Sequence, residues 1–247
     1  MAADRHRAAL AAAAVTPLLR WAVLVHAVPE DQPWRRHCPH CRAPLTPSSN
    51  LAALLPTGRC GVCARRVGPP PYTLEAATAV VAALVLLAAL PDRSVWEAAA
   101  AGVWGAVGVA LAFIDLAVHR LPFRLTVPAG AAALALLGVA ALTGGGGEAW
   151  VRAALAGTGC GLAFALVTLI FGARAFGLGD AGLALGAGVL LGWLGWGAVV
   201  VGLFLAFLGS GLVALTLLVT GRASRRDSLP FGPYLAGGTL LTLAWLA

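Results

Sequence analysis

The sequence predicts an all-α integral membrane protein, a polytopic bundle of about seven to eight transmembrane helices with a small cytoplasmic zinc-ribbon-like insert. Hydrophobic residues make up 60% and charged residues 11% of the 247 positions, whereas a soluble domain is about half apolar and about a quarter charged. The long apolar runs are continuous rather than alternating, which favours helices over a barrel. One polar stretch, residues 29–72, interrupts these runs and contains four cysteines.

The net charge of +7 is carried by arginine, since the chain contains no lysine. In a soluble domain such a basic balance would suggest nucleic acid as a partner. Here the arginines gather in the polar insert and in short loops between apolar runs, which is typical of the cytoplasmic side of a membrane protein. The sequence therefore predicts contact with membrane lipid and no nucleic-acid partner.

Seven apolar runs predict membrane-spanning helices. Their approximate bounds are 73–90, 95–114, 125–142, 150–172, 181–196, 198–219 and 231–247. Residues 8–28 form a weaker first segment because Pro17 and Arg20 interrupt it, so a helix lying on the membrane surface is an alternative to a span. We expect no cleavable signal peptide there, since no convincing small-residue cleavage site follows.

Alternation of these spans gives a testable topology. Four loops fall on one side: 29–72, 119–124, 173–180 and 221–230. They hold twelve of the 17 arginines, and cytoplasmic loops carry such an excess, so this side should face the cytoplasm. The expected organisation is an N-terminal membrane or surface segment at 1–28, the cytoplasmic four-cysteine insert at 29–72 and a transmembrane core at 73–247.

The insert contains two Cys-x-x-Cys pairs, Cys38-Pro-His-Cys41 and Cys60-Gly-Val-Cys63, separated by 18 residues. Two such turns can present four thiolates to a tetrahedral zinc ion in a closed structural site. The segment is too short to fold around a hydrophobic core of its own, so the metal would stabilise it. Two thiol pairs with a redox role are the alternative.

Two acids lie beside apolar helix on the predicted cytoplasmic side: Asp115 at the end of one span and Asp180 at the start of another. A carboxylate at the edge of hydrocarbon is costly and usually has a function. Gly177 and Gly179 let the backbone beside Asp180 turn freely and be approached closely, which suits substrate or loop positioning. The alternatives are a helix cap for Asp180 and a juxtamembrane acid for Asp115.

Two carboxylates that share a site do not both ionise easily, so one keeps a proton. The ionised one can deprotonate a water that attacks a peptide carbonyl, while the other protonates the leaving nitrogen. Asp180 lies at a helix N-terminus, which favours negative charge, and Asp115 lies near a helix C-terminus, which disfavours it. The sequence therefore predicts peptide-bond hydrolysis with Asp180 as the base and Asp115 as the acid.

From about residue 35 onward the chain resembles the type IV prepilin peptidases. The shared motifs are Cys38-Pro-His-Cys41, Cys60-Gly-Val-Cys63, Pro71-Tyr-Thr-Leu-Glu75, Ile114-Asp115-Leu116, Leu121-Pro122, Leu125-Thr-Val-Pro128, Phe176-Gly-Leu-Gly-Asp180 and Leu229-Pro-Phe-Gly-Pro-Tyr-Leu235. The resemblance implies a membrane aspartic endopeptidase of the bacterial inner membrane, with Asp115 and Asp180 as its catalytic aspartates. It would remove the leader peptide of prepilins or pseudopilins at the cytoplasmic membrane face. Many members then methylate the new N-terminus using S-adenosylmethionine.

The chain departs from that family at three places. An aspartate usually follows Leu-Pro, where this chain has Phe123, and a lysine usually stands two residues after the motif aspartate, where it has Gly182. Residues 8–28 lack the family's N-terminal pattern, so the resemblance supports peptide cleavage more strongly than methyl transfer. The departures keep open a second hypothesis, a non-catalytic membrane scaffold or assembly protein with the same fold. A transporter is disfavoured because both acids lie at one surface.

Overall fold

The computed structural model describes residues 2–29, 32–89, 93–172, 177–224 and 229–246, which form eight α-helices and one short 3₁₀ helix. In chain order the elements are α1 (Ala2–His26), η1 (Leu51–Leu54), α2 (Thr73–Ala89), α3 (Val95–Val118), α4 (Phe123–Gly144), α5 (Gly147–Phe171), α6 (Leu178–Leu194), α7 (Trp196–Val219) and α8 (Gly232–Trp245). Within the described residues β-structure is limited to two isolated bridges in the insert. The prediction of an all-α bundle with a cysteine-rich insert is confirmed.

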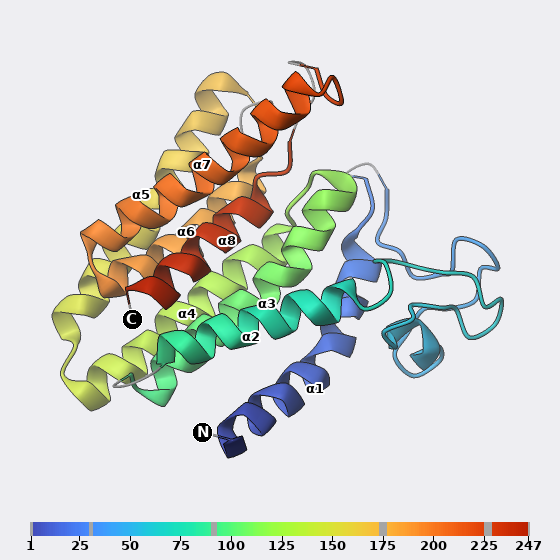
Figure 1. Ribbon diagram of the computed structural model, residues 1–247, viewed down its shortest axis with the longest axis horizontal. Coiled ribbons are helices and arrows are strands. Elements are labelled where there is room, and N and C mark those ends of the chain that lie inside the picture. The colour runs from blue at the N-terminus through green and yellow to red at the C-terminus, as the bar shows by residue number, and fades with distance from the viewer. Residues whose placement is uncertain (1, 30–31, 90–92, 173–176, 225–228, 247) are drawn as a thin grey trace.

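The helices form one bundle, and the insert between α1 and α2 projects beyond the ends of these two helices (Figure 1). Helix α6 is the central element, because it packs against α4, α5, α7 and α8 and buries most of its residues. Helices α5 and α6 approach closely through glycine: a Cβ added at Gly188 would lie 2.9 Å from the Cα of Gly157. Small residues at such contacts let membrane helices pack backbone against backbone.

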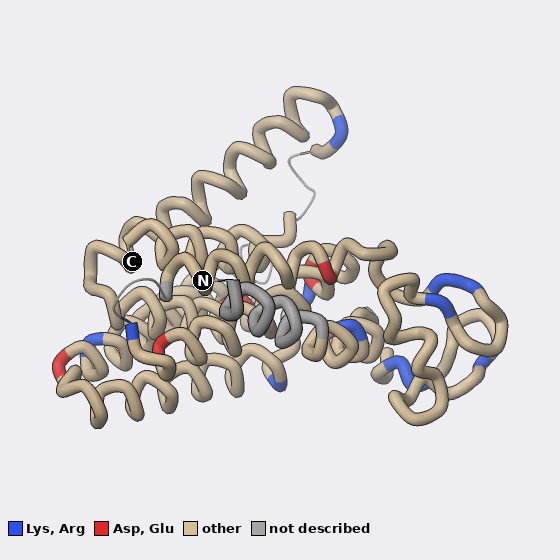
Figure 2. Tube along the Cα trace, turned by 60° about the horizontal axis from the view of Figure 1, so that its bottom comes forward, with Lys and Arg blue, Asp and Glu red and all other residues tan. Residues whose placement is uncertain are grey.

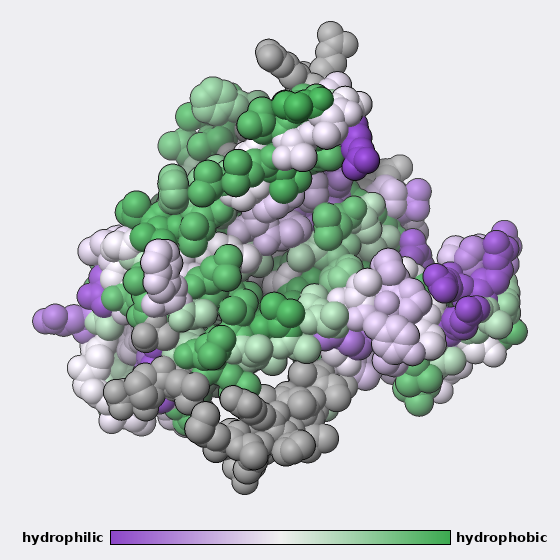
Figure 3. Space-filling view, in the orientation of Figure 1, coloured by the Kyte–Doolittle hydropathy of each residue, from purple (hydrophilic) through white to green (hydrophobic). Residues whose placement is uncertain are grey.

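Four helices are long and apolar enough to cross a membrane: α3, α4, α5 and α7. Three further apolar helical segments are shorter: Ala14–His26, Thr73–Ala88 and Leu178–Leu194. Charged residues gather at the ends of the bundle and on the insert (Figure 2), and apolar residues cover much of the face between them (Figure 3). This distribution is the one that a lipid bilayer imposes on a helical bundle.

Two helix boundaries differ from the predicted ones where the acids lie. Helix α3 continues to Val118 and ends at His119, whose φ of 50° is left-handed, so Asp115 belongs to the last turn of the helix rather than following it. Helix α6 begins at Leu178, so Asp180 belongs to its first turn. The prediction stopped each span at its charged residue because hydropathy falls there, whereas a helix ends where its backbone turns.

Arg20 explains why the first segment tolerates a charge. Its side chain is completely buried, and its Nη2 lies 2.8 Å from both carboxylate oxygens of Glu75 in the first turn of α2. The guanidinium also donates to the carbonyl oxygens of Pro56 and Pro69 in the insert, at 3.3 and 3.4 Å. One side chain thus joins α1, the insert and α2.

We expect the Arg20→Met variant to lose about 3–5 kcal/mol of stability, because it leaves the Glu75 carboxylate without its buried partner. Thermal unfolding of the purified protein in detergent measures the loss. A double variant with Glu75→Leu should recover most of it, since an apolar pair of similar volume leaves no charge unpaired. A double variant no more stable than Arg20→Met would contradict this role.

Candidate active site

Asp115 is held by two helices that are far apart in the sequence. It lies in the last turn of α3, and its side chain is only 4% exposed. Its Oδ2 accepts a 2.8 Å hydrogen bond from the backbone N–H of Gly232, the first residue of α8. Position 232 suits glycine because a Cβ there would lie 2.9 Å from the same oxygen. The amino end of α8 therefore holds the carboxylate of α3.

Asp180 is anchored within its own helix. It lies in the first turn of α6, and its Oδ2 accepts a 2.7 Å hydrogen bond from the backbone N–H of Gly177, the residue that precedes the helix. This bond is the capping role that the sequence left open, yet it occupies one carboxylate oxygen only. No other described residue bonds the second oxygen of either aspartate, so Oδ1 of each remains available.

The start of α6 and the start of α8 meet at Leu121, in the loop between α3 and α4. A Cβ at Gly179 would overlap the carbonyl oxygen of Leu121, and a Cβ at Gly232 would lie 3.3 Å from Cδ1 of the same leucine. Glycine is required at 179 because the two backbones touch. The structure thus brings Asp115 and Asp180 to the same end of the bundle, at the starts of α6 and α8.

The helix ends no longer distinguish the roles of the two acids. The carboxyl end of α3 disfavours negative charge at Asp115, and the sequence predicts no other helix end beside this residue. The structure adds the amino end of α8, whose N–H bond to Asp115 favours that charge. Both carboxylates therefore face a helix N-terminus, and the assignment of Asp180 as base and Asp115 as acid loses its electrostatic ground.

Gly182 and Phe123, where the chain departs from its resemblance, have different settings. Gly182 is buried against α4, and a Cβ there would overlap Oγ1 of Thr126 and lie 3.0 Å from the Cβ of Thr126. Phe123 is the first residue of α4 and is 48% exposed. Position 182 therefore serves the packing of α6 on α4, and this backbone leaves no room for a larger side chain.

Substituting Gly182 with alanine should destabilise the protein by about 1–3 kcal/mol, because the added methyl overfills a tight contact. Gly159→Ala is the matched control, since Gly159 lies on α5 and a Cβ there would meet nothing within 4 Å. That change should be neutral or slightly stabilising in a helix. Equal melting temperatures for the two variants in detergent would show that position 182 is not tightly packed.

The insert forms two turns of the same design, one around each Cys-x-x-Cys pair. In the first, the N–H of Arg42 donates to the carbonyl of Cys38 at 2.9 Å, and in the second the N–H of Ala64 donates to the carbonyl of Cys60 at 2.9 Å. Arg42 and Ala64 both adopt left-handed φ angles, 59° and 55°. An isolated β-bridge closes each turn. The two pairs therefore share the same local backbone geometry.

The four sulfurs of these turns can hold one metal ion. All lie within 4.8 Å of one another, with Cys38 and Cys63 at 3.9 Å and Cys41 and Cys60 at 3.7 Å. A tetrahedral zinc site with bonds of about 2.3 Å has sulfurs about 3.8 Å apart, so the donor set and its spacing fit this metal. The prediction that these four cysteines come together is confirmed.

Asn50 supports this cluster, and the sequence reasoning missed it. Its Nδ2 donates to the sulfur of Cys60 at 3.3 Å, and its Oδ1 accepts the N–H of Gly61 at 2.8 Å. The pKa of Cys60 is lowered to about 6 because the N–H of Cys63, the Asn50 amide and the N–H of Val62 donate to its sulfur. Such second-layer donors orient metal ligands and favour the thiolate. A lone asparagine in a polar insert gives no pattern from which this could be inferred.

The base of the insert also touches the loop between α3 and α4 and the first turn of α4, both just after Asp115. The guanidinium of Arg124 lies 4.8 Å from the centre of the Trp34 ring, a cation–π contact. Nη1 of Arg120 donates to the carbonyl oxygen of Pro29 at 3.2 Å. These contacts join the insert to the end of the bundle where the two aspartates meet.

The fold and this end of the molecule define a class: a polytopic helical membrane protein with paired carboxylates at one end of its bundle and a four-cysteine insert beside them. The family model described as the type IV leader peptidase family matches residues 103–219. The chain belongs to this family of peptidases.

Curated relatives support this membership over most of the chain. The prepilin leader peptidase/N-methyltransferase of Aeromonas hydrophila is 33% identical over 218 residues, which cover 85% of this chain and 71% of the relative. The protein of the same name from Burkholderia pseudomallei is 34% identical over 219 residues, or 85% of this chain and 66% of the relative. The one from Bacillus subtilis is 28% identical over 213 residues, or 84% and 80%. No solved structure matches the chain.

Proposed function

We propose that this protein is a membrane aspartic endopeptidase that cleaves the leader peptide of type IV prepilins or pseudopilins. One observation carries the proposal within the family: Asp115 and Asp180, from helices far apart in the sequence, lie at the same end of the bundle, where Leu121 touches the starts of α6 and α8. The names of the curated relatives supply the substrate class. Residues 73–247 would form the peptidase core, with 1–28 and 29–72 as accessory segments.

The proposed chemistry uses both carboxylates and one water. The ionised aspartate takes a proton from the water as its oxygen attacks the scissile carbonyl carbon. The protonated aspartate hydrogen-bonds the carbonyl oxygen and then gives its proton to the leaving nitrogen as the C–N bond breaks. The bonds from Gly232 and Gly177 fix one oxygen of each acid, which leaves the other to face water and substrate. Gly179 contributes by letting Leu121 close against the start of α6.

The position of the acids suits a substrate that is anchored in lipid. Both lie at the ends of apolar helices, so a scissile bond that directly precedes an apolar segment could reach them while that segment stays in the bilayer. The arginine-rich insert lies at the same end. By the excess of positive charge on cytoplasmic loops, we assign this end to the cytoplasmic face of a bacterial plasma membrane.

We further propose that the insert holds a structural zinc ion through Cys38, Cys41, Cys60 and Cys63. Four thiolates complete a tetrahedral shell, which leaves no open position for catalysis, so the metal would stabilise the fold of the insert. The relatives' names also include methyl transfer. For this chain that implies S-adenosylmethionine as a second substrate, and a methyl group on the new N-terminus of a cleaved prepilin would be its product.

A cleavage assay tests the proposal. The purified protein, in detergent or lipid, is incubated with a prepilin-like substrate that has a short leader before an apolar segment, with and without S-adenosylmethionine. We expect mass spectrometry to find the leader released at that junction, and a methylated product only when the methyl donor is present. A substrate that stays intact under all conditions would favour the scaffold hypothesis, and cleavage without methylation would limit the activity to the peptidase.

A further inference from the structure

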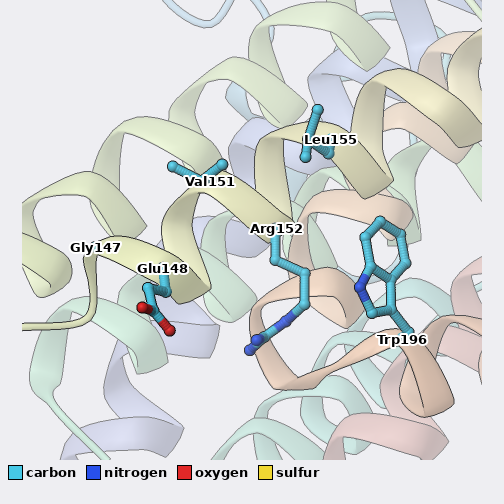
Figure 4. Close-up of a pocket in the computed structure, with 6 residues that line it drawn as sticks. All are labelled: Gly147, Glu148, Val151, Arg152, Leu155 and Trp196. Atoms are coloured by element: carbon cyan, nitrogen blue, oxygen red, sulfur yellow. The ribbon is translucent and has the colours of Figure 1, made fainter.

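A groove of about 490 Å³ lies at the end of the bundle opposite the two aspartates. It is opposite because α5 and α7, which both begin there, follow the ends of α4 and α6 that point away from the aspartates. Its walls come from the first three turns of α5 and from the first residue of α7 (Figure 4). The lining residues are Gly147, Glu148, Val151, Arg152, Leu155 and Trp196.

Arg152 is fixed in this groove by the end of another helix. Its Nε donates to the carbonyl oxygen of Gly192 at 2.8 Å, and its Nη2 donates to the carbonyl oxygen of Trp193 at 2.9 Å. These carbonyls belong to the last turn of α6, which carries partial negative charge. The two hydrogen bonds hold the guanidinium in place. Because a guanidinium has five N–H donors, its Nη1 still has donors for a ligand.

Glu148 stands one helical turn before Arg152, at a spacing that commonly forms an ion pair. No such pair joins these two described residues, because Arg152 is turned to the carbonyls of α6. The carboxylate of Glu148 is exposed, and both charged side chains line the same groove. The groove therefore presents a positive and a negative group that do not neutralise each other.

The remaining walls are apolar and face outward. Val151, Leu155 and Trp196 are 52%, 59% and 57% exposed; the first two lie on α5 beside Arg152, and Trp196 is the first residue of α7. Tryptophan prefers the depth at which lipid headgroups meet hydrocarbon. Along α5 the groove runs from the charged Glu148 to the apolar Leu155, about two helical turns further from the helix end.

We propose that this groove binds a zwitterionic phospholipid with a primary amine, such as phosphatidylethanolamine. Its phosphate would accept hydrogen bonds from Arg152, its ammonium group would donate to Glu148, and one acyl chain would lie along Leu155 and Trp196. Phosphatidylglycerol has the phosphate without the ammonium, so the Glu148 carboxylate would repel it. Phosphatidylcholine has a quaternary amine that cannot donate a hydrogen bond. The site is independent of the peptide chemistry proposed above.

Native mass spectrometry of the full chain, released from micelles with equal amounts of phosphatidylethanolamine and phosphatidylglycerol, tests the proposal. The wild type should retain phosphatidylethanolamine preferentially. Glu148→Gln should reduce this preference about two- to five-fold, the range of a solvent-exposed ion pair. Thr158→Val, an exposed change further along α5, is the control and should leave the preference unaltered.

A photoactivatable phosphatidylethanolamine should cross-link within residues 147–155 or at Trp196, and this locates the lipid without relying on a variant. Trp196→Ser should lower the retention of both lipids, because it removes part of the apolar wall. Equal retention of the two lipids by the wild type, an unchanged preference in Glu148→Gln, or cross-links only elsewhere would overturn the proposal.

Discussion

Replacing Asp115 or Asp180 with asparagine is expected to lower kcat/KM for prepilin cleavage by at least about 10²–10⁴-fold, the contribution of a positioned acid or base. Asparagine keeps the shape of the side chain and an oxygen that can accept the N–H of Gly232 or Gly177. It cannot take up or release the proton that the reaction requires. The two single variants and the double variant should be about equally inactive, because the residues act as a unit.

Melting temperature and metal content separate this loss from misfolding. Both asparagine variants should keep the metal and most of the stability of the wild type, since the anchoring hydrogen bonds remain. Thr158→Ala, an exposed change on α5, is the control for substitution as such and should cleave at the wild-type rate. If Asp180→Asn cleaved normally, Asp180 would be a helix cap only, and the paired-acid mechanism would be wrong.

Removing the metal from the four-cysteine cluster is expected to unfold the insert while the bundle persists. Binding of zinc to a structural site is worth on the order of 10–16 kcal/mol in small peptides, and the insert has little core to replace it. Cys60→Ser should have the same effect, because it removes one of the four sulfurs that would hold the metal. Hydrogen exchange should rise over residues 32–72 and stay low in α3 and α6.

Cleavage should also weaken when the insert unfolds, because Pro29 contacts the loop between α3 and α4 and Trp34 contacts the first turn of α4, both just after Asp115. Cys160→Ser is the matched control: Cys160 is buried in α5, outside the insert, and its loss should leave the metal stoichiometry unchanged. Full protection of residues 32–72 after exhaustive chelation would indicate that the insert folds without metal.

Local sequence patterns predict the main residues of the candidate site but not the contacts that hold them. Asp115, Asp180 and the four cysteines stand out in the sequence because acids beside apolar runs and paired Cys-x-x-Cys turns are each unusual. The alternation of spans also places both acids on one side. Gly232, which holds Asp115, lies in a recognised motif but offers no local reason to face a residue 117 positions earlier.

For two residues, Arg20 and Gly182, the contacts in the structure give a different role from the one that the sequence indicates. In the sequence Arg20 argues against a membrane segment, whereas in the structure it is fully buried and bonded to Glu75. In the sequence Gly182 stands where the family usually has a lysine, whereas in the structure it is the point where α6 touches Thr126 of α4. A charge is judged alone in a linear pattern, and its cost depends on partners that only packing supplies.

By itself, the sequence determined the helical membrane class, the cysteine cluster and the two candidate acids, because hydropathy, helix length and ligand spacing are properties of short segments. The tertiary structure alone decided that α8 holds Asp115, that Leu121 lies where α6 and α8 begin, and that Arg152 bonds the carbonyl oxygens of α6 rather than Glu148. These contacts join residues far apart in the chain, and their geometry follows from how whole helices pack, which no local pattern specifies.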